Sequence, residues 1–252
     1  RVANLAKPTP ERPALMRHDD VTTFFHEMGH VFHWLLSRTK YSRFHGTAVA
    51  RDFVEAPSQM LENRCWEAEV LKRMSSHYKT QEPLSDDLIA KIVKSRYVNV
   101  GLFYLCQLFF ANFDFAVHNN SLDVNMDYTK LWNELREKIS LVQGSEDKPG
   151  QGTFGHIVGG YDAGYYGYTY SLVFAADMYA RMVFKKASLD PTLGRLYRDK
   201  ILFVGGSRDD MGVPVGMPSL IMDFLGREPD PKAFINEIEQ DGNGDAARAS
   251  NL

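Results

Sequence analysis

Apolar side chains recur along most of this chain at the spacing of three and four residues that is typical of helices. The pattern predicts helices over residues 20–37, 54–77, 85–118, 126–142, 161–186, 189–201, 218–225 and 231–239. Residues 41–52 suit a short β-ribbon, and no set of alternating strands indicates a large sheet. The glycine-rich break from Gly144 to Gly160 is the segment that we expect to be most mobile. We therefore predict a mainly α-helical fold.

The first predicted helix is apolar around most of its circumference, yet residues 26–30 read His-Glu-Met-Gly-His. His26 and His30 are one turn apart on one face, where both imidazoles reach a single tetrahedral zinc ion. Glu27 lies about 100° round the axis, where its carboxylate can act as a general base on a metal-activated water without binding the metal. The alternative is that all three are buried polar groups satisfied by hydrogen bonds. The cost of burying three ionisable side chains favours the metal.

A catalytic zinc ion needs a third protein ligand and an open fourth position. His33 is about 10 Å along the helix axis from His26, too far for one ion. Pro57 suits the first turn of a second helix, which would return Glu55 to the metal as the third ligand. The polar positions of that helix could instead form a solvated face. Gln59 and Glu62 are both candidates for orienting a ligand histidine, and their spacing does not choose between them.

The pentapeptide 26–30 and the segment 51–63, Arg-Asp-Phe-Val-Glu-Ala-Pro-Ser-Gln-Met-Leu-Glu-Asn, resemble the thimet oligopeptidase, neurolysin and saccharolysin family of zinc metallopeptidases. The resemblance implies that His26, His30 and Glu55 bind one zinc ion and that Glu27 is the general base. It also implies a helical zincin-type catalytic core, and an endopeptidase that hydrolyses internal bonds of short peptides.

A second segment, residues 153–168, passes from a glycine-rich loop into a run of tyrosines. Tyr161, Tyr165 and Tyr168 share one face if the run is helical, and such a stripe more often serves packing than chemistry. The glycines nevertheless suit a substrate-binding loop, and phenols and imidazoles can donate hydrogen bonds to an oxyanion. The segment is similar to the substrate loop of the same family. That similarity implies that His156, Tyr161 and Tyr168 stabilise the transition state and that Tyr165 binds substrate.

The resemblance continues through Leu196–Arg198, Gly205–Ser207 and Phe224–Pro229, so it covers nearly the whole chain. Three features depart from the family pattern. Arg64 and Tyr170 stand where relatives usually carry tryptophan, and the stretch 208–217 between Gly206 and Phe224 looks longer than in relatives. We expect these departures to affect local packing and substrate preference and to leave the metal ligands and the base intact.

The length of 252 residues suits one large domain or two small ones. Family members are much longer, with an N-terminal part that forms the other wall of a channel. We therefore expect residues 1–240 to be the C-terminal catalytic region and 241–252 to be a flexible tail. Two alternatives stay open. One is a catalytically inactive zinc-binding fragment that lacks the other wall, and the other is a helical interaction module in which the His-Glu-Met-Gly-His sequence is coincidental.

Composition narrows the class of partner. A net charge of −3 gives no basic footprint for nucleic acid. The apolar run 98–116 is interrupted by Asn99, Gln107, Asn112 and Asp114, which indicates a buried helix and no membrane span. The two cysteines are too few for a disulfide framework and fit a reducing compartment as free thiols. We expect a cytoplasmic protein, with the mitochondrion as the alternative, whose partners are short peptides; the sequence does not give its oligomeric state.

Overall fold

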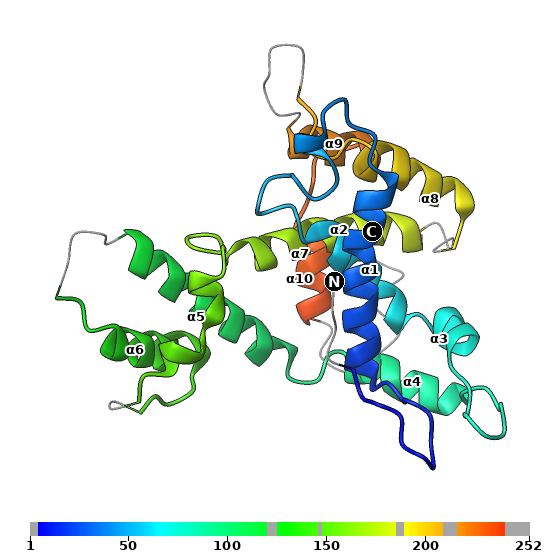
Figure 1. Cartoon of the computed structure of the whole chain (residues 1–252), viewed down its shortest axis with the longest axis horizontal. Coiled ribbons are helices and arrows are strands. Elements are labelled where there is room, and N and C mark those ends of the chain that lie inside the picture. The colour runs from blue at the N-terminus through cyan, green and yellow to red at the C-terminus, as the bar shows by residue number, and fades with distance from the viewer. Residues whose placement is uncertain (1–4, 120–124, 146–147, 185–188, 209–215, 240–252) are drawn as a thin grey trace. The chain divides into compact units, whose positions relative to one another are not determined.

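A computed structural model describes residues 5–119, 125–145, 148–184, 189–208 and 216–239. Over these ranges the chain is helical and forms no strand, which confirms the predicted fold class (Figure 1). The β-ribbon considered for residues 41–52 does not form. Bonds from Phe44 N to Tyr41 O and from His45 N to Ser42 O make a single 3₁₀ turn there instead. The predicted tail, 241–252, lies outside the described residues.

The α-helices in chain order are α1 His18–Leu36, α2 Ala56–Glu62, α3 Ala68–Met74, α4 Asp86–Ser95, α5 Val100–Asn119, α6 Tyr128–Ser140, α7 Gly167–Phe184, α8 Pro191–Tyr197, α9 Met217–Leu225 and α10 Lys232–Glu239. Single-turn helices are η1 Ser42–Phe44, η2 Asn63–Trp66, η3 Gly150–Thr153, η4 Gly155–Val158 and η5 Arg198–Leu202.

Three predicted helices have different bounds in the structure. The helix expected over 54–77 is divided into α2, η2 and α3, because Glu67 is extended (φ −88°, ψ 127°). The helix expected over 85–118 is divided into α4 and α5 by a turn in which Asn99 has φ +59°. The helix expected from 161 begins only at Gly167, because Ala163 has φ +52°. Left-handed residues cannot continue a right-handed helix, and side-chain periodicity does not reveal them.

The chain divides into two compact units with separate hydrophobic cores. The first comprises residues 1–98 and 172–252, and the second comprises residues 99–171. The core of the first unit is built around Phe53, Met178, Ile221 and Phe224. The core of the second unit is aromatic: Trp132 of α6 packs edge-on against Phe109 and Phe113 of α5, with ring centroids 4.6 and 4.9 Å apart.

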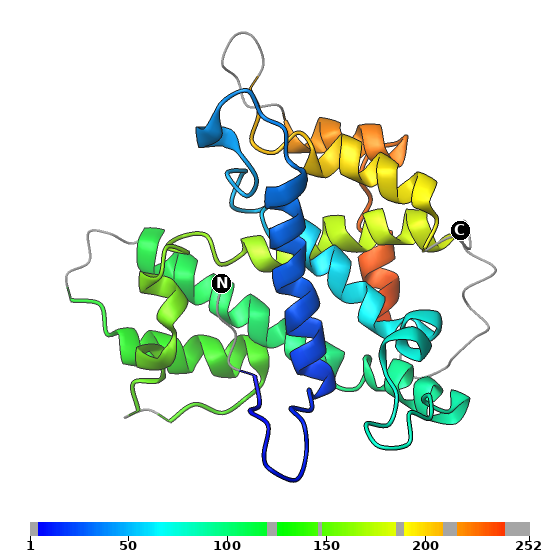
Figure 2. The same ribbon diagram turned by 45° about the vertical axis from the view of Figure 1, so that its right-hand side comes forward.

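The packing of α1 on α2 is the feature of the first unit that positions the candidate site. The two helices lie side by side in both views (Figures 1 and 2). They approach so closely that a Cβ added to Gly29 would lie 2.5 Å from the Cα of Ser58. The end of α1 is held by a backbone bond of 2.8 Å from Arg38 N to Phe203 O. The residue that starts α2, Glu55, is thereby brought to the face of α1 that carries His26.

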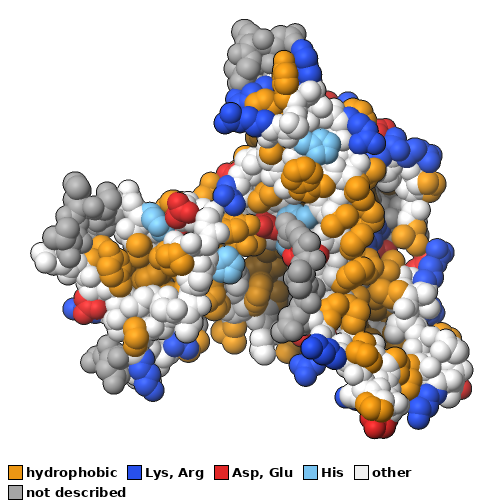
Figure 3. All heavy atoms as spheres, viewed as in Figure 1, with side chains coloured by type: hydrophobic (Ala, Val, Ile, Leu, Met, Phe, Trp, Pro, Cys, Tyr) orange, Lys and Arg blue, Asp and Glu red, His pale blue; other side chains and the backbone are white. Residues whose placement is uncertain are grey.

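Helix α5 is less buried than the sequence suggests. Leu102 and Phe103 each keep 54% of their surface exposed, and hydrophobic side chains gather on the surface over α5 and α6 (Figure 3). By length and composition the stretch Asp86–Asn119 could cross a membrane, with 22% of its most apolar window buried. Core helices of soluble proteins pass the same test, so this stretch carries no membrane assignment.

Both cysteines are free thiols, as expected. Cys65 is buried, and burial raises its pKa to about 12, which keeps the thiol protonated and unreactive. Burial also raises the pKa of Cys106, which is half-buried. The sequence left open whether these thiols are sensitive to oxidation, and the environment of Cys65 argues against it for that residue.

Candidate metal centre

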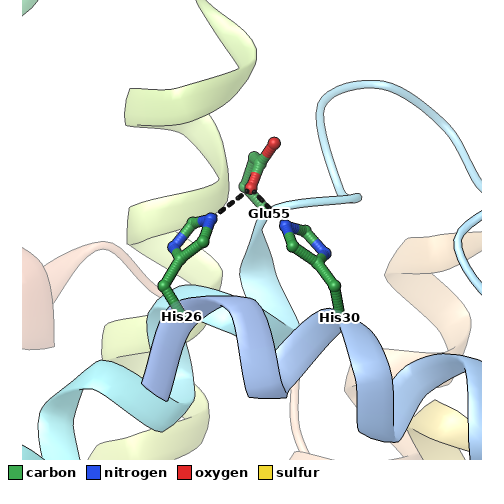
Figure 4. Close-up of side chains that lie close together, drawn as sticks. All are labelled: His26, His30 and Glu55. Carbon is green, nitrogen blue, oxygen red and sulfur yellow. Dashed lines mark ion pairs between the residues drawn. The ribbon is translucent and has the colours of Figure 1, made fainter. Parts of the chain in front are cut away.

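The structure brings His26, His30 and Glu55 together around one point (Figure 4). Oε2 of Glu55 lies 3.2 Å from Nε2 of His26 and 3.1 Å from Nε2 of His30. Ligand atoms of a tetrahedral zinc ion with bonds of about 2.0–2.1 Å are about 3.3 Å apart, and both distances from Glu55 match this value. Within the described parts of the chain this is the one cluster of histidine, cysteine and carboxylate groups that could hold a metal, and His33 is not part of it.

The start of α2 fixes the carboxylate of Glu55. Glu55 is the N-cap of α2 and Pro57 lies in its first turn, as the sequence predicted. The hydroxyl of Ser58, which is fully buried, donates to the main-chain oxygen of Glu55 at 2.8 Å and to its Oε2 at 3.2 Å. Sequence reasoning did not assign Ser58 a role. The signal was a serine three residues after the ligand, on the first turn of a helix.

His26 is also held from its other side. Its Nδ1 lies 2.6 Å from Oε1 of Glu62, so of the two candidates considered for orienting a histidine, Glu62 is the one in contact with His26. Burial alone would lower the pKa of His26, but the hydrogen bonds and charges of Glu55 and Glu62 outweigh it and raise the pKa to about 9. The site therefore favours positive charge at neutral pH. A metal ion must displace this proton, so its affinity falls as the pH is lowered.

The predicted tyrosine segment also forms a cluster, within the second unit. The rings of Tyr161 and Tyr168 stack with centroids 4.8 Å apart. The ring of His156 lies 5.8 Å from Tyr161, 5.2 Å from Tyr165 and 5.7 Å from Tyr168. The structure thus gathers all four residues, although α7 begins too late for the tyrosines to share a helical face.

Tyr165 differs from the other tyrosines of this cluster. It is buried in the aromatic core of its unit, and its hydroxyl donates a hydrogen bond of 2.9 Å to Oε1 of Gln107. Burial raises its pKa to about 12. Its hydroxyl is therefore engaged within the protein, and its role in substrate binding stays a prediction.

Comparison with known proteins places the chain in a family. Residues 1–240 match the model of peptidase family M3. The chain belongs to peptidase family M3. It is 43% identical to saccharolysin of Saccharomyces cerevisiae over 240 residues, which are 94% of this chain and 33% of that protein. It is 38% identical to the thimet-like oligopeptidase of Dictyostelium discoideum (94% of this chain, 34% of that protein) and 35% identical to oligopeptidase A of Haemophilus influenzae (92% and 33%).

The M3 match confirms the resemblance seen in the motifs. The chain spans about a third of the length of these curated relatives. Glu27 follows His26 on α1 and is half-buried, and its role as base stays a prediction.

Two of the three departures from the M3 pattern fall on described residues. Arg64 donates to Glu67 at 2.8 Å and lies over the ring of Tyr179, whose hydroxyl donates to the same carboxylate at 2.8 Å. Arg64 is thus held by an ion pair with Glu67 and by contact with the ring of Tyr179. Tyr170 is 47% exposed. Residues 209–215, which make up most of the longer stretch, lie outside the described residues.

Replacing Glu62 with glutamine tests the partner of His26. The new amide keeps an acceptor for Nδ1 but removes the negative charge, so we expect zinc affinity to fall about 10- to 100-fold. Competition with a chromophoric chelator measures the change. Glu69→Gln is the matched control, because Glu69 is exposed and pairs with Arg73. Equal affinity in Glu62→Gln and the unmodified protein would show that Glu62 does not support the metal.

His33, which the sequence analysis excluded as a metal ligand, should make the stability of the fold depend on pH. It is fully buried, and neither ring nitrogen has a hydrogen-bond partner among the described residues. Burial, together with nearby His30 and His45, lowers its pKa to about 4. The unfolded chain takes up a proton near pH 6.5 and the folded chain does not, so stability is lost as the pH falls from about 6.5 toward 4. The loss is on the order of 3 kcal/mol over that window.

His33→Leu is expected to remove this acid sensitivity, because leucine has a similar volume and does not titrate. The free energy of unfolding in urea, measured at pH 7 and pH 5 with chelator present, should fall less for His33→Leu than for the unmodified protein. His77→Gln, at an exposed position, should behave like the unmodified protein. The assignment is wrong if His33→Leu and the unmodified protein lose the same stability.

Proposed function

We propose that this protein is a zinc-dependent metalloendopeptidase that hydrolyses internal bonds of short peptides. The observation that carries the proposal is the convergence of His26, His30 and Glu55, with Glu55 Oε2 3.2 and 3.1 Å from the two imidazoles of α1, the helix that also carries Glu27. Membership of family M3 supports a peptidase, and the relatives named oligopeptidases support short peptides as substrates.

Each residue has a distinct role in this proposal. His26, His30 and Glu55 would hold a zinc ion, which would supply the Lewis acidity that lowers the pKa of water and polarises a carbonyl. Glu27 accepts the proton of the attacking water and passes it to the leaving amine, whose departure breaks the peptide C–N bond.

The second cluster acts on the oxygen of the scissile carbonyl. We propose that the imidazole of His156 and the hydroxyls of Tyr161 and Tyr168 donate hydrogen bonds to the oxyanion of the tetrahedral intermediate. The stacking of Tyr161 on Tyr168 supports a joint role, because each ring limits the freedom of the other. Tyr165, with its hydroxyl on Gln107, contributes by packing and is the weaker candidate for contact with substrate.

We propose that the protein acts in the cytoplasm, with the mitochondrion as the alternative. The free thiols fit the cytoplasm. A relative from Arabidopsis thaliana is named an organellar oligopeptidase, chloroplastic/mitochondrial, which keeps the mitochondrion as the alternative.

The test is cleavage of peptides of increasing length by this chain and by a longer form of the protein, followed by mass spectrometry. We expect internal cleavage that a chelator stops and added zinc restores. Bound zinc with cleavage by the longer form alone would favour the inactive fragment, for which the relatives give no support. Absence of stoichiometric zinc would favour the interaction module. Absence of chelator-sensitive cleavage by both forms would overturn the proposal.

A further inference from the structure

Three polar residues of α5 lie on one face of the helix and contact one loop. Gln107, Asp114 and His118 are spaced by seven and four residues, which places them on the same side of a largely apolar helix. All three contact residues 161–165, the segment that links the glycine-rich loop to α7. In the sequence, Gln107 and Asp114 interrupt an apolar run. In the structure, both form hydrogen bonds with the segment 161–165.

Asp114 makes the strongest of these contacts. It is 0% exposed. Its Oδ1 accepts the backbone N–H of Ala163 at 3.0 Å, and its Oδ2 accepts that of Tyr165 at 2.9 Å. Nδ1 of His118 lies 2.9 Å from Oδ1. A buried carboxylate is costly unless donors face it, as the two backbone N–H groups do here, so the loop and the carboxylate stabilise each other.

The described backbone-to-backbone bonds of the loop are all local, so they do not tie it to α5. Bonds link Gly164 N to Tyr161 O and Gly167 N to Gly164 O, at 2.9 and 3.0 Å, and α7 begins only at Gly167. Ala163 has φ +52°, a conformation that a residue with a Cβ adopts only at a cost. The bond from Ala163 N to Asp114 falls on this strained residue and offsets part of that cost.

We propose that Asp114 is a positioning residue for peptide hydrolysis: from α5 it fixes the backbone at Ala163 and Tyr165, and thereby the placement of Tyr161 and Tyr168. The inference rests on the proposed function, because it concerns the residues assigned there to the oxyanion. Gln107 adds a second tie, through the hydroxyl of Tyr165. Asp114 acts through the loop and is assigned no contact with substrate or metal.

Asp114→Asn tests the proposal. The amide group keeps the volume of the carboxylate but turns an NH₂ toward one of the two N–H donors, so one bond is lost. A displacement of about 1 Å at catalytic groups can cost about 100-fold, and we expect a loss of this size in kcat. KM should change little, because the tyrosines are assigned to the transition state. Zinc content should stay equal, and amide hydrogen exchange should quicken at Ala163 and Tyr165.

Asp177→Asn is the matched control. Asp177 is an equally buried carboxylate that accepts the backbone N–H of Asp230 at 2.8 Å and pairs with Arg227, all within the first unit. A general loss of stability lowers activity in both variants, whereas a positioning role lowers kcat in Asp114→Asn alone. Equal losses of kcat in the two variants, or turnover by Asp114→Asn within about threefold of the unmodified protein, would overturn the proposal.

Two further outcomes need their own measurements: failure of Asp114→Asn to fold, and absence of peptide cleavage by the unmodified protein. If Asp114→Asn does not fold, Gln107→Leu removes only the tie to the Tyr165 hydroxyl. A fall in kcat of about tenfold then supports the proposal, and unchanged kcat overturns it. If the unmodified protein cleaves no peptide, the proposed function fails, while hydrogen exchange at Ala163 and Tyr165 still decides whether Asp114 anchors the loop.

Discussion

Glu27→Gln is expected to abolish peptide hydrolysis while zinc stays bound. Glutamine has nearly the same size and keeps a carbonyl oxygen, but it cannot accept and return a proton near neutral pH. General acid and base catalysis contributes about 10²- to 10⁴-fold, so turnover should fall by about 1,000-fold or more. The proposed ligands His26, His30 and Glu55 are unchanged, so metal analysis should give one zinc ion per chain in variant and unmodified protein alike.

Glu55→Gln gives the contrasting result. It replaces the oxygen that lies 3.2 and 3.1 Å from the two imidazoles with a neutral ligand, so zinc and activity should be lost together. Glu69→Gln, at an exposed carboxylate, should retain both. The assignment of Glu27 would be wrong if Glu27→Gln kept near-normal turnover, or if it lost zinc as Glu55→Gln does.

Local rules were sufficient to predict that the proposed metal ligands lie together. Positions four apart on a helix must share a face, so His26 and His30 follow from the helical pattern alone. Pro57 marked the start of α2 correctly, and the start of α2 is what presents Glu55. The orienting residue required the structure, since Gln59 and Glu62 lie on overlapping faces and only the approach of α2 to α1 brings Glu62 to Nδ1 of His26.

Backbone conformation is what the side-chain pattern could not predict. Asn99 and Ala163 both adopt left-handed φ: Asn99 separates α4 from α5, and Ala163 lies before the start of α7, where the side-chain pattern predicts continuous helix. The anchor at Asp114 was also hidden, because its partners are backbone N–H groups 49 and 51 residues away. A backbone donor has no sequence signature. The one sign of this contact in the sequence was an aspartate within an apolar helical pattern.

Gly29 shows how sequence pattern and tertiary packing can conflict. It has no catalytic chemistry, yet it sets how closely α1 and α2 approach at the candidate metal site. Glycine inside a helix costs about 1 kcal/mol relative to alanine, so the pattern alone would favour replacement. In the structure an added Cβ would lie 2.5 Å from Ser58 Cα, 3.0 Å from Pro57 O and 3.1 Å from Ser58 N. All three are backbone atoms of the turn that holds Glu55, and they cannot rotate away.

Gly29→Ala is therefore expected to push α2 from α1 and to carry Glu55 away from the two histidines. Overpacking of this kind typically costs about 1–3 kcal/mol of stability. Zinc affinity should fall by more than the roughly 100-fold upper value for loss of an orienting partner, because a ligand itself is displaced. Chelator competition measures the affinity, and urea unfolding with chelator present measures the stability.

Gly194→Ala is the matched control for Gly29→Ala. Gly194 is also inside a helix, α8, but an added Cβ there meets nothing within 4 Å. Alanine should stabilise the protein at this position by up to about 1 kcal/mol and leave zinc affinity unchanged. Opposite signs for the two substitutions separate helix propensity from the contact between helices. If Gly29→Ala also stabilises the protein and keeps its zinc, the close approach of α1 and α2 is not what holds Glu55 at the metal.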